Sequence, residues 1–235
     1  ADLGASVTNV ERPGPGDDTR AWGPPYVPAM AGETPHAGYF AAVNRGKRSM
    51  TLDFTRPEGR DLVIALAREA DVLIENYKVG TLARYGRGYE DLKKINPGLV
   101  YCSITGFGQS GPYAALPGYD FVFQGMSGLM SYTGKPDDTP GGGPVKVGVA
   151  IVDLTTGLYS TIAILGAIER RRETGEGTYI DMALLDCAVA TSSYQGVNHL
   201  LTGRESQPDG QRASDDGALQ RLRLQGRALH PGHRQ

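Results

Sequence analysis

The sequence has few cysteines, few histidines and almost no net charge, and each shortage excludes a class of protein. Among 235 residues only Cys102 and Cys187 are cysteines, too few for a disulfide framework or a metal cluster. The four histidines share no metal-ligand spacing. A formal net charge of −2 gives no bulk attraction to nucleic acid. We therefore expect no metal site, no nucleic-acid partner, and two cysteines buried as small apolar residues.

Two further features are missing from the chain. It contains no unbroken run of about 18 apolar residues, the length that predicts a membrane span. Its first residues lack the basic and then apolar layout of a signal peptide. With 40% hydrophobic and 21% charged residues the composition is typical of a globular domain. We expect a cytoplasmic protein without a membrane partner, long enough for one sizeable domain.

Apolar runs alternate with helical patterns through the first half of the chain. The expected strands are 50–54, 72–76 and 99–105, and the expected helices are 57–70 and 89–95. Strands joined by short helices form parallel sheets with right-handed crossovers. The sequence therefore predicts an α/β fold with a doubly wound parallel, Rossmann-like sheet. Ligands of such sheets lie beyond the carboxyl ends of the strands.

The remaining segments are less regular. Residues 13–38 are rich in proline and glycine and predict a long loop, which Trp22 anchors. A helical region is expected at 119–132, and a strand at 178–181 with a helix to about 201 after it. The tail 206–235 contains no aromatic residue, valine or isoleucine, so it cannot supply a core. We expect one domain over 1–205 and a disordered tail over 206–235.

Asp153 is the candidate catalytic residue. The segment 148–158 places this single carboxylate between an apolar run and a helix that is apolar on most faces, which we expect to be buried. A helix N-terminus has unpaired N–H groups and a partial positive charge, so Asp153 should stay ionised and be held in one direction. Such a carboxylate can attack an acyl carbon. An ordinary N-cap is the alternative interpretation.

Other patterns give weaker indications. The GxGxxG spacing at 106–111 is followed by Pro112 and not by a helix, which argues against a nicotinamide site. The glycines at 141–143 stand between prolines and predict a surface loop. Basic residues near expected strand ends could meet the phosphates of a nucleotide-like ligand on one side of the sheet. They are Arg12, Arg45, Lys47, Arg48, Lys78 and Arg84.

Several segments taken together resemble the class III (CaiB/BaiF-type) CoA-transferases, a family that includes formyl-CoA transferase and succinyl-CoA:glutarate CoA-transferase. The resemblance runs from residue 1 to about 205. The segments are ADLGA at 1–5, VERPG at 10–14, GDDTR at 16–20, NRGKRS at 44–49, ENY at 75–77, SITGFG at 103–108, GYD at 118–120 and VDLTTG at 152–157. So many matches in the family's order favour the catalytic interpretation of Asp153.

The resemblance implies a covalent mechanism. Asp153 would attack the thioester of an acyl-CoA to give an aspartyl anhydride and CoA thiolate. The thiolate would return to give an aspartyl-CoA thioester, and CoA would finally pass to the incoming carboxylic acid, which the similarity suggests is a dicarboxylate. No cofactor is implied beyond CoA and acyl-CoA as substrates. The positions that match the family's CoA site are Arg12, Leu52, Asp53, Phe54, Thr55, Asn76, Tyr77, Lys78, Arg84, Gly118, Tyr119 and Asp120.

Two alternatives stay open. The family contains 2-methylacyl-CoA racemases with a Gly-His-Asp motif, where this chain has Tyr119 in place of the histidine base, so a transferase is favoured. Family members also begin before Ala1, continue far beyond residue 205, and form interlocked homodimers. The resemblance therefore implies a fragment, which could be a catalytically dead chain that only binds CoA or associates with partner chains.

The tail has an unusual property. Codons can be chosen for residues 209–235 that, read one nucleotide out of phase, spell a continuation like that of the family. We therefore expect a frameshift near residue 208.

Overall fold

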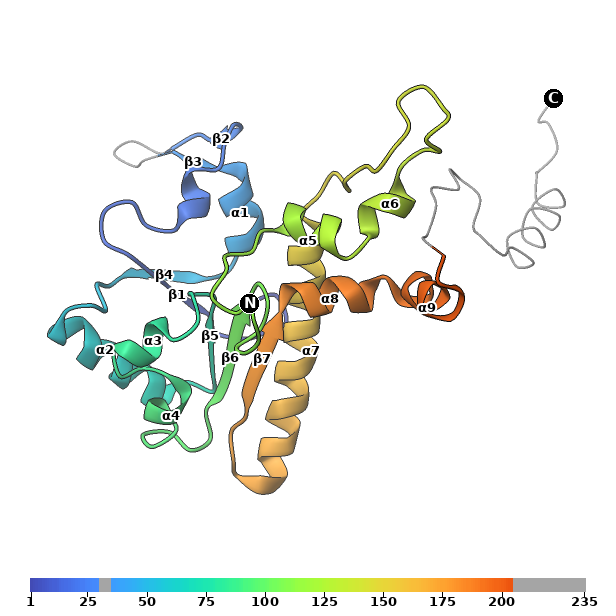
Figure 1. The fold of residues 1–235 in the computed structure, drawn as a ribbon. Helices are drawn as coiled ribbons and strands as arrows, with labels where there is room; N and C mark the ends of the chain where they lie inside the picture. The colour runs from blue at the N-terminus through green and yellow to red at the C-terminus, as the bar shows by residue number, and fades with distance from the viewer. Residues whose placement is uncertain (30–34, 205–235) are drawn as a thin grey trace, which may run out of the picture.

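The computed structural model describes residues 1–29 and 35–204, which form an α/β fold of parallel strands covered by helices (Figure 1). The strands are β1 (Thr8–Glu11), β2 (Tyr26–Val27), β3 (His36–Ala37), β4 (Arg48–Thr51), β5 (Val72–Glu75), β6 (Val100–Thr105) and β7 (Tyr179–Ala183). The helices are η1 (Asp18–Ala21, a 3-10 helix), α1 (Gly38–Asn44), α2 (Pro57–Glu69), α3 (Thr81–Arg84), α4 (Tyr89–Leu92), α5 (Asp120–Met126), α6 (Leu129–Thr133), α7 (Ile151–Thr174), α8 (Leu184–Thr191) and α9 (Ser193–Thr202).

The strands pair in two parallel ladders. One contains β1 and β4, and the other has the order β5-β6-β7. A short antiparallel pair joins β2 to β3. The predicted α/β class is confirmed. The predicted strands 72–76 and 99–105 do pair, as β5 and β6. The predicted strand at 50–54 corresponds to β4, which pairs with β1 and not with them.

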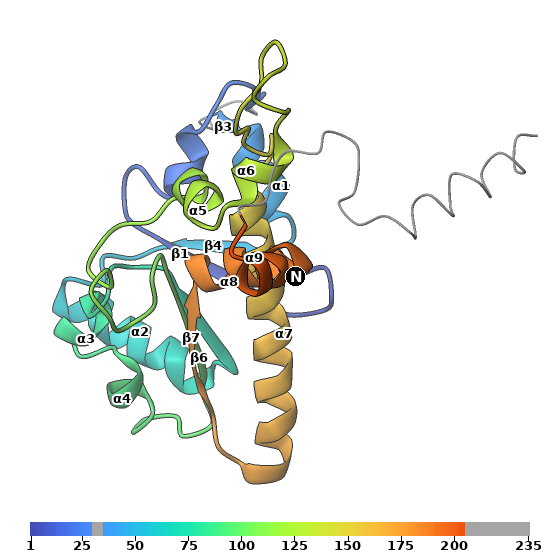
Figure 2. The same ribbon diagram turned by 45° about the vertical axis from the view of Figure 1, so that its right-hand side comes forward.

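Helices cover both faces of the β5-β6-β7 sheet. Helix α7 lies on one face, and α2, α3 and α4 lie on the other (Figures 1 and 2). On the second face Ala67, Leu92, Leu99 and Tyr101 form a buried cluster. A second buried cluster lies beyond the sheet, where α5, α7 and α8 contribute Phe123, Val152 and Ala188. Both cysteines are buried, as the sequence predicts.

Helix α2 illustrates how local sequence sets an element. It begins at Pro57, whose fixed φ suits the first helical position. It ends where the side-chain amide of Asn96 donates to the carbonyl oxygens of Ala67 (3.0 Å) and Ala70 (2.9 Å). The predicted range 57–70 is therefore confirmed to within one residue, and the cap attaches α2 to the chain leading into β6.

Helix α7 departs from its prediction. Its buried residues form a single stripe on the sheet side, whereas Leu158 and Ile162 on the outer side are 64% and 67% exposed. The expectation of a helix buried on most faces is wrong for the described residues, because nothing among them packs on that outer side.

By length and composition alone α7 could cross a membrane, with a mean hydropathy of 1.6 over an 18-residue window. The sequence has no unbroken apolar run here, because threonines, a serine and glycines interrupt the apolar residues of α7, yet the mean hydropathy of the window stays high. Length and composition are weak evidence, since the core helix of a folded domain passes the same test.

Two predicted helices are each divided. The region 119–132 forms α5 and α6, which separate at Gly128 (φ +79°). The helix expected after 181 forms α8 and α9, which separate near Ser193 (φ +49°). The predicted disordered tail, 206–235, lies outside the described residues.

Candidate functional site

The predicted site residues follow the carboxyl ends of parallel strands. Arg12 follows β1, the segment 52–55 follows β4, the segment 76–78 follows β5, and the chain after β6 leads to 118–120. This is the edge at which ligands of parallel sheets bind.

Asp153 lies in the first turn of α7, and no hydrogen bond or ion pair among the described residues engages its carboxylate. Loss of solvation raises the pKa of Asp153, and repulsion from the Asp120 carboxylate raises it further. The prediction that the helix N-terminus keeps Asp153 ionised and fixed in direction is wrong in its cause, because the carboxylate of Asp120 occupies the free amides.

Asp120 caps helix α7 from a distance in sequence. Its Oδ1 accepts hydrogen bonds from the backbone N–H of Val152 (2.7 Å) and of Asp153 (3.3 Å). Its Oδ2 accepts from Nε2 of Gln124 (2.6 Å), and Oε1 of that buried side chain accepts from the N–H of Val147 (2.8 Å). Asp120 and Gln124 therefore fix both the start of α7 and the segment before it. The N-cap role considered for Asp153 belongs to Asp120.

Tyr39, on α1, belongs to the same group. Its pKa is raised, first by burial and then by the negative charges of Asp153 and Asp120, which act on the hydroxyl electrostatically. The ring makes an edge contact with Trp22, 5.2 Å between centroids. Tyr39 is not among the residues that the sequence predicts for the site. The available signal was the predicted loop anchored by Trp22, since long loops in compact domains are often functional.

Aromatic side chains gather at the ends of β4 and β5. The ring of Phe54 makes T-shaped contacts with Tyr77 (5.4 Å) and Tyr85 (5.6 Å). Burial and then the negative charge of Glu75 raise the pKa of Tyr77, and the positive charge of Arg12 lowers it. The structure thus brings together Phe54, Tyr77 and Tyr85, whereas Arg12 pairs with Asp18. Arg84 donates to Thr81 at 3.5 Å.

The other predicted residues after β4 hold a turn. Oδ1 of Asp53 accepts from the N–H (3.0 Å) and the hydroxyl (2.6 Å) of Thr55, and these bonds lower the pKa of Asp53. Leu52 is buried beneath them. Gly59 allows the approach of α2, because a Cβ there would lie 1.9 Å from the carbonyl oxygen of Asp53. After β5, Asn76 and Lys78 are exposed.

The glycines after β6 have a packing role. A Cβ on Gly118 would lie 2.3 Å from the ring of Phe123 and 2.8 Å from Cα of Gly106. The two glycines therefore let the segments before α5 close onto each other. Tyr119, between Gly118 and Asp120, is 69% exposed.

Three of the predicted basic residues lie elsewhere. Arg45, Lys47 and Arg48 stand at the amino end of β4, where they bond to Asp2, Asn44 and Ser6 respectively. The expectation that all six basic residues gather on one side of the sheet is therefore wrong for these three. Arg12, Lys78 and Arg84 follow the opposite ends of strands.

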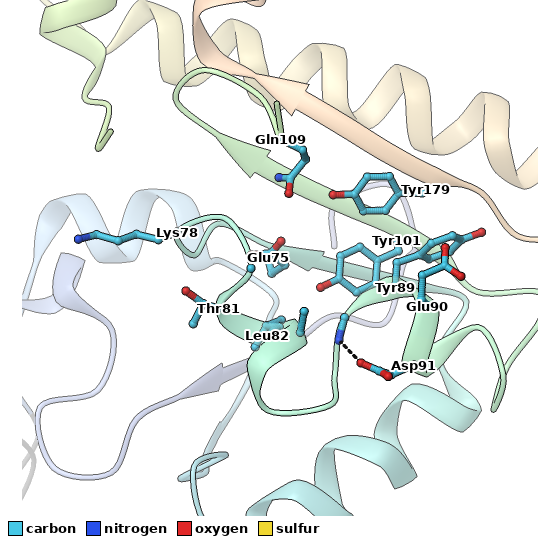
Figure 3. A pocket seen from close by; sticks show the side chains of 13 residues that line it. Glu75, Lys78, Thr81, Leu82, Tyr89, Glu90, Asp91, Tyr101, Gln109 and Tyr179 are labelled. Carbon is cyan, nitrogen blue, oxygen red and sulfur yellow. Dashed lines mark hydrogen bonds between the residues drawn. The ribbon is translucent and has the colours of Figure 1, made fainter. Parts of the chain in front are cut away.

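A pocket of about 280 Å³ lies between the sheet and helices α3 and α4 (Figure 3). Tyr89, Tyr101 and Tyr179 line it beside Glu75, whose pKa is raised by burial. Glu75 also accepts from the N–H of Tyr77 at 2.8 Å, which connects the pocket to the aromatic cluster. Asp153 does not line this pocket. Among residues 1–29 and 35–204 no group of His, Cys, Asp and Glu side chains could hold a metal ion.

Comparisons with known proteins agree on one family. The family described as CoA-transferase family III matches residues 1–222. The chain is 55% identical over 204 residues to a succinate–glutarate CoA-transferase of Agrobacterium fabrum, covering 87% of this chain and 50% of that protein. It is 45% identical over 205 residues to the human succinyl-CoA:glutarate CoA-transferase, covering 87% and 44%. A solved structure described as a CaiB/BaiF family protein from Brucella suis superposes with a TM-score of 0.82 at 55% identity, covering 88% of this chain and 53% of that one. The chain thus spans about half the length of these relatives.

Proposed function

Because this chain belongs to CoA-transferase family III, we propose that the protein moves CoA from an acyl-CoA to a free carboxylic acid, with Asp153 as the covalent nucleophile. The observation that carries the proposal is a carboxylate at the start of α7 with no hydrogen-bond partner in the described residues, beside a second carboxylate that holds the helix. Relatives are named for glutarate and for oxalate, so we propose a dicarboxylate as the acceptor.

The proposed reaction has four displacements at carbonyl carbon. An oxygen of Asp153 attacks the thioester carbon, the C–S bond breaks, and CoA leaves as thiolate from a mixed anhydride. The thiolate then attacks the acyl carbon of Asp153 and releases the donor acid. The acceptor carboxylate attacks the resulting aspartyl thioester, which again releases thiolate and forms a second anhydride. Attack of the thiolate on the acceptor's acyl carbon gives the new acyl-CoA and restores Asp153. No net proton moves, so the exchange needs no histidine base.

The surroundings of Asp153 suit this chemistry. A carboxylate with a raised pKa is a stronger nucleophile when ionised, and loss of solvation is the main cause of the raised pKa. The hydroxyl of Tyr39, whose pKa is raised first by burial, stays protonated near neutral pH. Asp120 keeps the start of α7 in place through each step.

We propose that CoA lies along the carboxyl ends of the strands. Arg12, Lys78 and Arg84 supply positive charge for its phosphates, and Tyr77 and Phe54 supply aromatic surface. The remaining predicted residues, Leu52, Asp53, Thr55, Asn76, Gly118 and Tyr119, would shape the backbone around it.

Chemical trapping tests the role of Asp153. The chain is incubated with succinyl-CoA, glutarate and hydroxylamine, which converts an activated aspartate to a hydroxamate, and is then digested with trypsin. The peptide 147–170 contains one aspartate, Asp153, and one glutamate, Glu169. We expect the hydroxamate in the native chain and in Glu169→Gln, and its loss in Asp153→Asn. A hydroxamate that persists in Asp153→Asn would contradict the covalent role.

Three further measurements separate the alternatives. Thioester exchange with glutarate, oxalate or succinate supports the transferase. Binding of CoA without exchange supports a chain that only binds CoA or associates with partners. Epimerisation of a 2-methylacyl-CoA without any acceptor acid supports a racemase.

Three expectations remain proposals. We propose a cytoplasmic location, an interlocked homodimer for the longer protein, and a partial large domain over 1–205.

The tail 206–235 lies outside the described residues, and we propose that it is out of frame. Sequencing the DNA around codon 208 tests this, because one inserted or deleted base should restore a family-like continuation, and an intact frame there refutes the idea.

A further inference from the structure

Arg87 is a buried arginine that the proposed site does not include. It lies between α3 and α4, where its backbone N–H donates to the carbonyl oxygen of Leu82 at 2.9 Å. The residue is 2% exposed. Charged side chains are almost never buried to this degree unless an opposite charge pairs with them.

Among the described residues Arg87 has no such partner. Its Nε and Nη1 atoms are enclosed and make no hydrogen bond within the described part of the chain. Nη2 is not among the enclosed atoms, so the guanidinium reaches the surface along that edge. Asp61 influences it electrostatically, yet no carboxylate oxygen of the described residues lies within 4.0 Å of its nitrogens. The neighbouring charge of Arg60 repels it.

Aromatic rings enclose the guanidinium. Its Cζ lies 5.8 Å from the ring centroid of Phe54 and 5.7 Å from that of Tyr85. These are the rings of the aromatic cluster at the ends of β4 and β5, whose members Tyr77 and Tyr85 are 42% and 39% exposed. Cation–π contacts offset part of the cost of burying the charge, and they supply no hydrogen-bond acceptor in the plane of the guanidinium. The guanidinium of Arg87 therefore still needs an anion to accept hydrogen bonds from its N–H groups.

The geometry points to a site in which Arg87 binds a terminal phosphate of a nucleotide whose base packs on Tyr77 and Tyr85. A guanidinium whose N–H groups make no hydrogen bond in the described residues, and which reaches the surface along its Nη2 edge, matches a phosphate monoester, which presents three acceptor oxygens. Exposed aromatic rings provide the stacking surface that every base accepts. The inference rests on the proposed function, since CoA carries one such monoester, on the 3′-carbon of its adenosine. Within that function it makes Arg87 a residue that recognises the nucleotide part of CoA.

Adenosine 3′,5′-bisphosphate and adenosine 5′-monophosphate are suitable probes, because they differ only in the 3′-phosphate. We would measure their affinities by calorimetry for the native chain, for Arg87→Leu, and for the control Arg68→Leu at the exposed far end of α2. A hydrogen-bonded charge contact of this kind corresponds to roughly ten- to hundredfold in affinity. We expect Arg87→Leu to lose that factor for the bisphosphate alone, and Arg68→Leu to bind both probes as the native chain does.

Each outcome decides the matter. Equal affinity of the native chain for the two probes, or an equal effect of Arg87→Leu on both, overturns the inference. Leucine removes an unpaired buried charge, so the variant should melt no lower than the native chain. If it fails to fold, the Nε–H resonance of Arg87 in the native chain still reports the contact, and it must shift with the bisphosphate and not with the monophosphate. A chain that distinguishes the probes but exchanges no thioester retains the phosphate site and loses the proposed catalytic function.

Discussion

Replacing Glu11 by glutamine should lower the free energy of unfolding by about 3 kcal/mol at pH 7. Glu11 is buried at the end of β1, where its carboxylate accepts two hydrogen bonds from Arg20 (2.7 and 2.8 Å), one from the hydroxyl of Ser49 (2.7 Å) and one from the N–H of Asp17 (2.8 Å). The hydrogen bond from Arg20 is the largest cause that lowers the pKa of Glu11 from 4.5 to about 2, against the opposing effect of burial.

The magnitude follows from that pKa. A carboxyl group whose pKa is lower in the folded than in the unfolded state stabilises the fold at pH values above the unfolded value. Each unit corresponds to about 1.4 kcal/mol, so a shift of about 2.5 units amounts to about 3 kcal/mol. As pH falls from about 4.5 to about 2 the carboxylate takes up a proton in both states, and the contribution disappears. Glutamine approximates the protonated form.

Urea unfolding at several pH values tests this reasoning. The difference between the native chain and Glu11→Gln should be near 3 kcal/mol at pH 7, should shrink below about pH 4.5, and should be nearly absent at pH 2. The control is Glu169→Gln, which removes an exposed pair with Arg172 on the surface of α7 and should cost no more than about 0.5 kcal/mol. If Glu11→Gln costs as little as this control, or if its cost persists at pH 2, the argument from the Arg20 pair is refuted.

The prediction also bears on the site. The guanidinium of Arg20 lies 3.9 Å from the ring centroid of Phe40, the neighbour of Tyr39 on α1. Glu11 therefore connects β1 to the helix that carries Tyr39. We expect hydrogen exchange in α1 to rise in Glu11→Gln together with the loss of stability.

Two further predictions concern the start of α7 and the turn after β4. In Asp120→Asn the carboxamide oxygen can still accept from the amides of Val152 and Asp153, but the repelling charge is lost. The pKa of Asp153 should therefore fall, and the acid limb of any exchange activity should move to lower pH. A carbon-13 NMR titration that finds the pKa of Asp153 unchanged would contradict this. Asp120→Ala, which also removes the cap, should cost about 1 kcal/mol in urea unfolding. Gly59→Ala should cost about 1–3 kcal/mol because its Cβ meets the carbonyl oxygen of Asp53, whereas Gly157→Ala, in open space on α7, should stabilise by about 0.5–1 kcal/mol. Equal effects of the two alanines in thermal unfolding would refute the packing argument.

The elements that the sequence predicts best are those whose pattern is local. Helix α2 is set by Pro57 and by an amphipathic repeat, and β6 by an apolar run, so both were found to within about one residue. The edge that carries the site was also predictable, because parallel strands bring their carboxyl ends together. What could not be predicted depends on contacts between distant segments. The pairing of β4 with β1 and the burial of Arg87 beside Phe54 and Tyr85 each join residues with no shared local pattern.

The environment of Asp153 differs from the one that its sequence position predicts. The helix N-terminus predicted from the sequence is present, yet its amides donate to Asp120, which lies 33 residues earlier in the chain. A carboxylate that accepts such bonds has a lower pKa and is a weaker nucleophile, so a self-capped Asp153 would have been less reactive. Asp120 instead satisfies the helix amides. Burial, and then the charge of Asp120, raises the pKa of Asp153, whose carboxylate makes no hydrogen bond in the described residues. Because Asp120 and Asp153 act as a pair, the GYD segment at 118–120 and the VDLTTG segment at 152–157 are explained by one structural requirement, the fixed start of α7.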